Sequence, residues 1–214
     1  MRTCLSEVAK RRLAVVAGAI WLTVCTCGVA ALVRYSRLTG DTGAALCEFP
    51  TDLQVQNSDK RFSLLMFVHP HCPCSHASLE ELMRIHARAQ QDLAIEIVFY
   101  HPANKSSAWA MTSLWRTAQA IPDVRISFDS DGRTAGRFGA KTSGHVVLYN
   151  SDGRLIFNGG ITPSRGHEGG NRGTTSVLEH IRSRDKTREI CPVFGCPLQA
   201  QAVPTDASIC GAVR

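Results

Sequence analysis

The sequence contains no internal repeat and no low-complexity segment, which excludes solenoid architectures and compositionally biased disordered chains. Most of the chain also lacks an excess of charge of either sign. Residues 38–214 hold 18 Lys and Arg residues and 17 acidic residues, a net charge of +1, whereas residues 1–37 hold six basic residues and one acid, a net charge of +5. Because a nucleic-acid surface needs basic residues clustered on the folded part, the charge distribution predicts no nucleic-acid partner.

Charge is absent altogether between Leu13 and Val33, a run of 21 residues that is long enough to cross a bilayer as a helix. Basic residues are denser before this run than after it. The positive-inside bias therefore predicts a single-pass membrane protein with a cytoplasmic N-terminus and an extracytoplasmic main domain, on the periplasmic side if the source is bacterial. The alternative is a cleaved signal peptide, which normally has a shorter apolar core.

The cysteines divide in the same way as the charge. Three of the nine lie in or before the apolar run, and six lie beyond it: Cys47, Cys72, Cys74, Cys191, Cys196 and Cys210. An even number outside a membrane permits disulfides, although spacing alone does not assign the pairs. The simplest interpretation pairs Cys191 with Cys196, or uses them to tie the tail to the domain, and pairs Cys47 with Cys210.

Beyond the apolar run, the hydrophobic pattern predicts an α/β domain. Its order is strand, helix, strand, helix, strand, short helix, hairpin and helix, which favours a mixed central sheet with helices on both faces. We expect strands at 62–68, 93–100, 124–128, 146–149 and 154–158, helices after Cys74, at 106–118 and at 174–184, and a short edge strand at 53–56. The resulting divisions are a membrane anchor (1–36), a linker (37–51), the α/β domain (52–186) and a cysteine-containing tail (187–214).

The pattern Cys72-Pro73-Cys74 follows the first of these strands directly and precedes a helix. Pro73 fits the first helical position, which would place Cys72 at the N-cap and Cys74 in the first turn. Exposed amides and the helix dipole favour a thiolate there, and a protonated His71 would add to that effect. The sequence leaves open which cysteine attacks, and we expect Cys72 to be the more exposed of the two.

Three segments carry a resemblance to the thioredoxin-like superfamily. FSLLMFVHPHCPCS is similar to the strand and active-site loop of that superfamily, FDSDGRTAGRFGA to the third strand and short helix of its membrane-anchored TlpA-like branch, and TSGHVVLYNSDGRLIFNGG to the closing hairpin. HPHCPCS, GGITPSRGHEGGNRG and VFGCPL further resemble the RedB-like proteins. The resemblance implies a thioredoxin-like fold over roughly residues 52–185.

Two departures from the superfamily pattern affect the expected chemistry. Only Pro73 separates the two cysteines, where the family normally has two residues. Gly144, beside His145, occupies the position of a proline that normally shapes substrate binding and keeps metals out. We therefore expect Gly144 and His145 to belong to a substrate or partner surface, together with Arg165, His167 and Glu168 of the glycine-rich loop at 159–173. This loop lacks the lysine pattern of a phosphate-binding loop, so no nucleotide is expected.

The main functional hypothesis is a thiol–disulfide oxidoreductase without a cofactor, acting on protein thiols or disulfides. Cys72 and Cys74 would be the catalytic pair, His71 would tune them, and Cys191 or Cys196 would be resolving or structural. A different hypothesis is a copper-binding or copper-delivering module, because thiolates and imidazoles suit Cu(I). Its candidate ligands are Cys72, Cys74, His71, His76 and Cys196. A third hypothesis is a non-catalytic binding domain.

Overall fold

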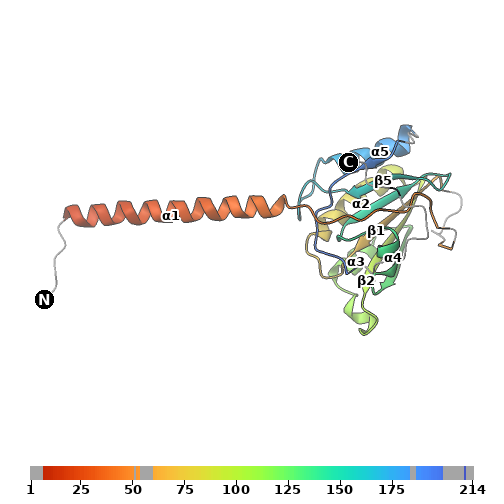
Figure 1. Cartoon of the computed structure of the whole chain (residues 1–214), viewed down its shortest axis with the longest axis horizontal. Helices are drawn as coiled ribbons and strands as arrows, with labels where there is room; N and C mark the ends of the chain where they lie inside the picture. Colours follow the sequence, from red (N-terminus) through yellow and green to blue (C-terminus); the bar gives the residue numbers. More distant parts are fainter. Residues whose placement is uncertain (1–6, 51, 54–59, 184–186, 200–209, 211–214) are drawn as a thin grey trace. The chain divides into compact units, whose positions relative to one another are not determined.

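A computed structural model describes residues 7–50, 52–53, 60–183, 187–199 and 210. The chain divides into two compact units, residues 1–38 and 39–214. The first unit contains α1 (Glu7–Ser36), a single uninterrupted helix of 30 residues, drawn in orange-red in Figure 1. By its length and composition α1 is able to cross a membrane, and it contains the whole uncharged run predicted from the sequence.

The second unit is built on one mixed sheet. Within the described residues its strand order is β3-β2-β1-β4-β5-β6. Neighbouring strands are parallel in the pairs β1–β2, β2–β3 and β5–β6, and antiparallel in β1–β4 and β4–β5. The predicted mixed sheet is therefore confirmed. The strands are β1 (Phe62–Val68), β2 (Leu93–His101), β3 (Val124–Ser130), β4 (His145–Tyr149), β5 (Leu155–Gly160) and β6 (Glu189–Ile190).

Helices cover the sheet because its central strands are apolar on both faces. Leu64 and Met66 of β1 enter one core with residues of α2 (Ser75–Ala89), α3 (Ser113–Gln119) and α5 (Arg172–Ser183). Leu65 and Phe67 point to the opposite face and enter a second core. That core includes Ala135 of α4 (Arg133–Arg137). The alternation along β1 thus places a helix layer on each side, as expected for a strand buried on both faces.

The helix predicted at 106–118 is wrong in its first half. The chain forms a short 3-10 turn, η1 (Ser107–Trp109), and α3 begins only at Ser113. Thr112 between them is extended, and its hydroxyl donates a hydrogen bond to the Pro70 carbonyl, 2.9 Å away. Contacts with the loop that follows β1 therefore interrupt the helical pattern. Most of the predicted edge strand at 53–56 lies outside the described residues.

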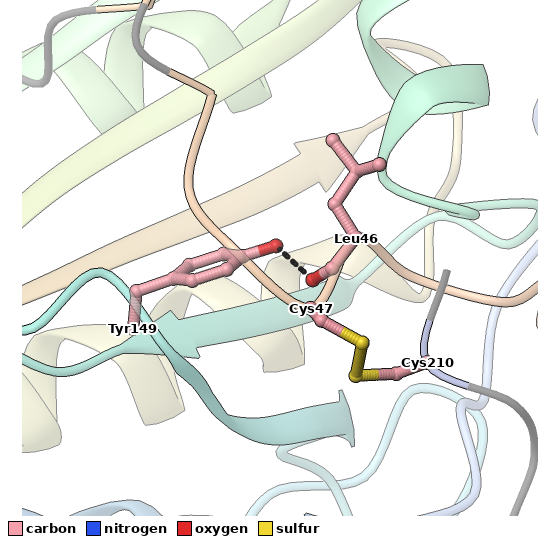
Figure 2. The surroundings of a disulfide bond; sticks show 4 residues. All are labelled: Leu46, Cys47, Tyr149 and Cys210. Carbon is pink, nitrogen blue, oxygen red and sulfur yellow. Dashed lines mark hydrogen bonds between the residues drawn. A yellow bond between two sulfur atoms is a disulfide. The ribbon is translucent and has the colours of Figure 1, made fainter. Parts of the chain in front are cut away.

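Both ends of the second unit are fastened to its sheet. Cys47 and Cys210 form a disulfide, as expected, next to a hydrogen bond from the Tyr149 hydroxyl to the Leu46 carbonyl (Figure 2). Ala45 in the segment predicted as a linker is buried in the second core, and so is Leu198 of the tail. The predicted Cys191–Cys196 disulfide is not formed, because both residues are free thiols and Cys191 is buried in the first core.

Candidate thiol site

The loop between β1 and α2 presents the Cys-Pro-Cys motif. A tight turn closes it, in which the Cys72 N–H donates to the His69 carbonyl (3.0 Å) and the Ser75 N–H donates to the Cys72 carbonyl (3.2 Å). α2 begins at Ser75, so Cys74 is its N-cap residue. The prediction that Cys72 caps this helix is therefore wrong, because the turn uses Cys72 and Pro73 before regular helical geometry begins.

The C-terminal tail brings a third thiol to this loop. Its residues run alongside the segment before β4, where the Ser143 N–H donates to the Cys196 carbonyl and the Leu198 N–H to the Lys141 carbonyl, both at 2.8 Å. The Cys196 N–H lies 3.4 Å from Cys72 Sγ and donates to it. As a result, the sulfur atoms of Cys72, Cys74 and Cys196 all lie within 4.8 Å of one another.

The three thiols differ in access to solvent. Cys72 is buried, with 2% of its surface exposed, whereas Cys74 and Cys196 are half-buried. The prediction that Cys72 is the more exposed thiol is therefore wrong. Cys196, in the tail, lies against Cys72, although the two residues are 124 positions apart in the sequence. A bulky partner would reach Cys74 before it reached Cys72.

The environment of Cys72 favours its thiolate. Burial is the largest single influence and acts to raise the pKa of Cys72. The hydrogen bonds from Ser75 and from the backbone and side chain of Cys196 together outweigh burial and hold the pKa of this thiol below its usual range. Ser143 Oγ accepts the His69 N–H (2.8 Å) and lies 2.7 Å from Ser75 Oγ. Ser75 donates its hydroxyl proton to Cys72. The Ser75 oxygen can therefore accept the hydroxyl proton of Ser143, whose oxygen accepts the His69 N–H.

The other two thiols are held in the protonated form. Burial raises the pKa of Cys74, and the neighbouring Cys72 charge raises it further. Burial likewise raises the pKa of Cys196, to about 12, and its hydrogen bond to Cys72 acts in the same direction. The positive charge of Arg165 opposes both shifts without reversing them. The site thus combines one thiol that ionises readily with two that retain their protons.

The histidines around the motif point to other partners. His71 is exposed, and its Nε2 donates to the Trp109 carbonyl at 3.1 Å, while its ring lies edge-on to the Trp109 ring. His69 accepts the His71 N–H through Nδ1 (3.2 Å) and stacks on Tyr100. Burial, followed by the charge of His71, lowers the pKa of His69. His76 is exposed on α2.

Gly144 and His145 do not form the surface predicted for them. Both are buried, and His145 has no exposed area. His145 Nε2 is hydrogen-bonded to Asn158 Oδ1 in the interior, and burial lowers the pKa of His145 to about 4. Gly144 has φ +88°, and a Cβ there would lie 2.7 Å from Ser78 Oγ. Glycine at this position is therefore explained by backbone geometry and close packing.

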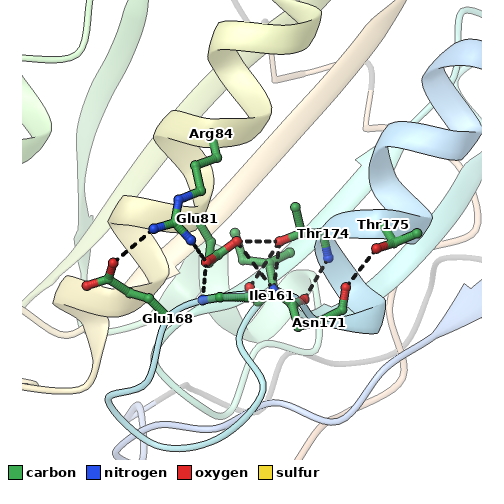
Figure 3. Close-up of polar contacts among 8 residues, drawn as sticks. Glu81, Arg84, Ile161, Glu168, Asn171, Thr174 and Thr175 are labelled. Atoms are coloured by element: carbon green, nitrogen blue, oxygen red, sulfur yellow. Dashed lines mark hydrogen bonds and ion pairs between the residues drawn. The ribbon is translucent and has the colours of Figure 1, made fainter.

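The glycine-rich loop is anchored by a buried carboxylate that the sequence did not single out. Glu81 of α2 is 1% exposed and accepts hydrogen bonds from the Gly169 N–H (2.8 Å) and the Thr174 hydroxyl (3.0 Å), with Arg84 2.5 Å away (Figure 3). Glu168 pairs with Arg84 (3.2 Å). The loop is thereby bound to α2 and α5, and the exposed His167 folds back on the Arg165 carbonyl.

Arg165 is the predicted loop residue that reaches the thiol site. Its Nη1 donates to the Gly195 carbonyl at 2.5 Å, directly before Cys196. A Cβ on Gly195 would lie 2.0 Å from the Ser143 carbonyl oxygen, so only glycine permits the tail to pass this close. Sequence analysis missed Ser75 and Ser143. Ser75 could have been noticed as the residue that follows the motif, whereas no local pattern points to Ser143.

The three cysteines are also the residues that could hold a metal ion. Among the described residues, the group close enough to share an ion consists of Cys72, Cys74 and Cys196. His71 and His76, which the copper hypothesis included, are not members of this group. The chemistry open to the site is therefore that of three sulfurs: exchange with disulfides, or binding of a soft ion.

Solved structures share this fold. A hypothetical protein from Sinorhizobium meliloti 1021 matches with a TM-score of 0.54 at 20% identity, over 78% of this chain and 97% of its own. An uncharacterized conserved protein from Geobacillus kaustophilus matches with a TM-score of 0.53 at 14% identity, over 78% of this chain and 94% of its own. The pneumococcal exposed lipoprotein thioredoxin from Streptococcus pneumoniae has a TM-score of 0.44 at 16% identity, over 65% of this chain and 99% of its own. No family model and no curated protein sequence matches the chain.

The second unit thus has the mixed sheet with flanking helices that the sequence predicted, and it shares this fold with the Sinorhizobium meliloti and Geobacillus kaustophilus structures.

Proposed function

We propose that this protein is a membrane-anchored, extracytoplasmic thiol–disulfide oxidoreductase that acts on protein thiols or disulfides. The observation that carries the proposal is a buried thiol with a lowered pKa, Cys72, held within 4.8 Å of two further thiols at the start of a helix. Thiol exchange requires a thiolate and a second sulfur within reach, and this site supplies both. The motifs HPHCPCS, GGITPSRGHEGGNRG and VFGCPL support placing the chain in the RedB-like group of the TlpA-like branch.

The difference in exposure assigns the order of the two steps. The half-buried Cys74 first passes its proton to the neighbouring Cys72 thiolate and then attacks one sulfur of the partner's disulfide as a thiolate. The other partner sulfur leaves as a thiolate and takes that proton from Cys72. The Cys72 thiolate then attacks Cys74 Sγ, which forms the Cys72–Cys74 disulfide and releases the second partner sulfur as a thiolate. Two thiols of this protein are oxidised and one partner disulfide is reduced. The reverse sequence oxidises a partner dithiol.

Trapping the mixed disulfide tests this order. With the full chain in detergent, Cys72→Ser combined with Cys196→Ser is expected to accumulate a covalent adduct at Cys74 with a model disulfide, because both thiols that could resolve it are removed. Cys74→Ser is expected to lose turnover. Cys191→Ser removes a free thiol outside the site and is the matched control. Exchange that survives in Cys74→Ser would overturn the proposed order, and a parent protein without any exchange activity would favour a non-catalytic binding domain.

In this proposal α1 anchors the protein in the membrane. α1 has the length and apolarity of a membrane span, and the denser positive charge at its N-terminal end supports a cytoplasmic N-terminus. The Cys47–Cys210 disulfide supports an oxidising location for the second unit, because such bonds persist outside the cytosol.

A further inference from the structure

The third thiol gives the site a geometry that disulfide exchange between two cysteines does not require. Cys196 reaches the motif from the tail, and its sulfur lies within 4.8 Å of both Cys72 Sγ and Cys74 Sγ. Thiolate sulfurs bind a metal ion such as Zn²⁺ at about 2.3 Å. Three sulfurs around one ion in a trigonal plane would therefore stand about 4 Å from one another. The observed grouping therefore needs only small side-chain movements to enclose one ion.

We propose that the reduced protein binds one Cu(I) ion through the three thiolates of Cys72, Cys74 and Cys196. Soft thiolate ligands select Cu(I), and three sulfurs without a fourth ligand suit it better than Zn²⁺, whose structural sites are four-coordinate. The grouped residues include no carboxylate or imidazole among those the structure describes. The Arg165 guanidinium is held beside Cys196 by its bond to the Gly195 carbonyl and offsets part of the thiolate charge.

Histidine takes no part in this site. His71 Nε2 already donates to the Trp109 carbonyl, and the His71 N–H occupies His69 Nδ1. The ligand set therefore differs from a mixed sulfur and imidazole site in a way that single substitutions can separate.

Copper binding and disulfide exchange compete for the same sulfur atoms. A partner's disulfide that oxidises Cys72 and Cys74 to a disulfide removes two ligands, is itself reduced to two thiols, and releases the ion.

The test is an anaerobic titration of the reduced full chain in detergent with Cu(I), in competition with a coloured Cu(I) chelator. Cys4, Cys25 and Cys27 are replaced by alanine in every sample, so that cysteines outside the second unit add no background binding. We expect one Cu(I) per chain. Loss of a residue that only hydrogen-bonds to a metal ligand weakens metal binding by roughly 10–100-fold, so Cys196→Ser, which removes a direct ligand, should weaken it by at least about 100-fold.

Matched variants decide the ligand set. His71→Ala, His76→Ala and Cys191→Ser are expected to keep the parent affinity, and copper X-ray absorption should show three sulfur ligands and no nitrogen. Unchanged affinity in Cys196→Ser, or equal loss in His71→Ala, would overturn the three-thiolate site. Near-ultraviolet circular dichroism of each metal-free variant verifies that it is folded. Because Cys196→Ser places a hydroxyl beside the buried Cys72, Cys196→Ala provides a second variant with the same expectation.

This inference concerns the same thiols as the proposed function and rests on their grouping, but the two proposals can be tested separately. Thiol exchange measured on copper-free protein tests the function alone. Exchange without Cu(I) binding would overturn the copper site and leave the oxidoreductase intact. Tight Cu(I) binding without exchange would do the opposite.

Discussion

At the scale of single residues, the reactivity of the site depends on neighbours that the motif does not contain. Ser75 and Ser143 are fully buried and hydrogen-bonded to each other, and Ser75 supports the Cys72 thiolate. Ser143 lies 68 residues from Ser75, and Cys196 lies 124 residues from Cys72. No local pattern in the sequence predicts such pairs, because only the folded chain brings them together. The two motif cysteines, by contrast, stand out in the sequence by their position between a strand and a helix, and the structure places them between β1 and α2.

Removing the Ser75 hydroxyl is expected to raise the pKa of Cys72. The largest influence on this thiol, burial, already raises its pKa, and the Ser75 hydrogen bond is the largest one that opposes burial. A Ser75→Ala variant should therefore hold less Cys72 thiolate at neutral pH, measured by thiolate ultraviolet absorbance against pH. Ser78→Ala, a buried serine of the same helix, is the control. Identical titrations of the two variants would contradict the role given to Ser75.

His145 should make the folded state sensitive to acid. Its pKa is about 4 in the folded protein because of burial, against 6.5 for an ordinary histidine. Between these values the unfolded chain binds a proton that the folded chain does not, so stability falls as pH drops from about 6.5 to about 4. The difference corresponds to about 3 kcal/mol. Urea unfolding at several pH values should show this slope, and His145→Gln should flatten it. An equal slope in both proteins would exclude His145 as its source.

At the scale of elements, the sheet was predictable and the connections were less so. Apolar runs bounded by turns indicated β1 and β2 nearly to the residue, since burial on both faces leaves a continuous hydrophobic signal. The helix expected at 106–118 failed because Thr112 and Trp109 bond to the loop after β1. The tail shows no periodicity because backbone pairing, close glycine contacts and separate buried residues such as Leu198, not a continuous apolar face, hold it in place.

Gly195 should be essential for placing the tail. A Cβ at this position would lie 2.0 Å from the Ser143 carbonyl oxygen. Only a movement of the backbone could relieve this contact. Gly195→Ala is expected to withdraw Cys196 from Cys72, which would raise the pKa of Cys72 and speed alkylation of Cys196 by roughly tenfold or more, since about 1.4 kcal/mol of opening changes exposure tenfold. The control is Gly170→Ala, where a Cβ would meet nothing within 4 Å. Alkylation measured by mass spectrometry would contradict the argument if both variants matched the parent.

Glu81 should be the main polar support of the glycine-rich loop. It is buried and binds Arg84, the Gly169 N–H and the Thr174 hydroxyl. Hydrogen bonds to a charged group contribute about 1.5–3 kcal/mol, so Glu81→Gln should lower the free energy of unfolding by about 2 kcal/mol. The neighbouring Glu80→Gln should change it by less than about 0.5 kcal/mol, as for an ordinary surface position. Urea unfolding measures both. Equal stability of the two variants would show that the loop is held by other contacts.

At the scale of the whole molecule, a disulfide links the two ends of the second unit. Cys47 follows the segment after α1 and Cys210 lies in the tail that also carries Cys196, so one bond fastens both ends to the sheet. The even number of cysteines beyond the apolar run indicated that disulfides were possible, and this pairing was one of the two expected. The sequence did not reveal which of the two forms, because Cys191 enters the core while Cys196 joins the thiol site.

The Cys47–Cys210 bond is expected to stabilise the fold substantially while leaving the site chemistry intact. It joins residues 163 apart, and removing a native bond of this kind lowers stability by about 2–5 kcal/mol, chiefly through the freedom that the unfolded chain regains. Replacing both cysteines by serine should therefore lower the urea midpoint of the full chain in detergent, whereas Cys25→Ser, which removes a free thiol of α1, should not. Because Cys196 is held by its own backbone pairing with Ser143, thiol exchange under folded conditions should persist without the disulfide. Loss of exchange at a urea concentration where circular dichroism still reports a folded domain would show instead that the bond positions the tail, and with it the third thiol.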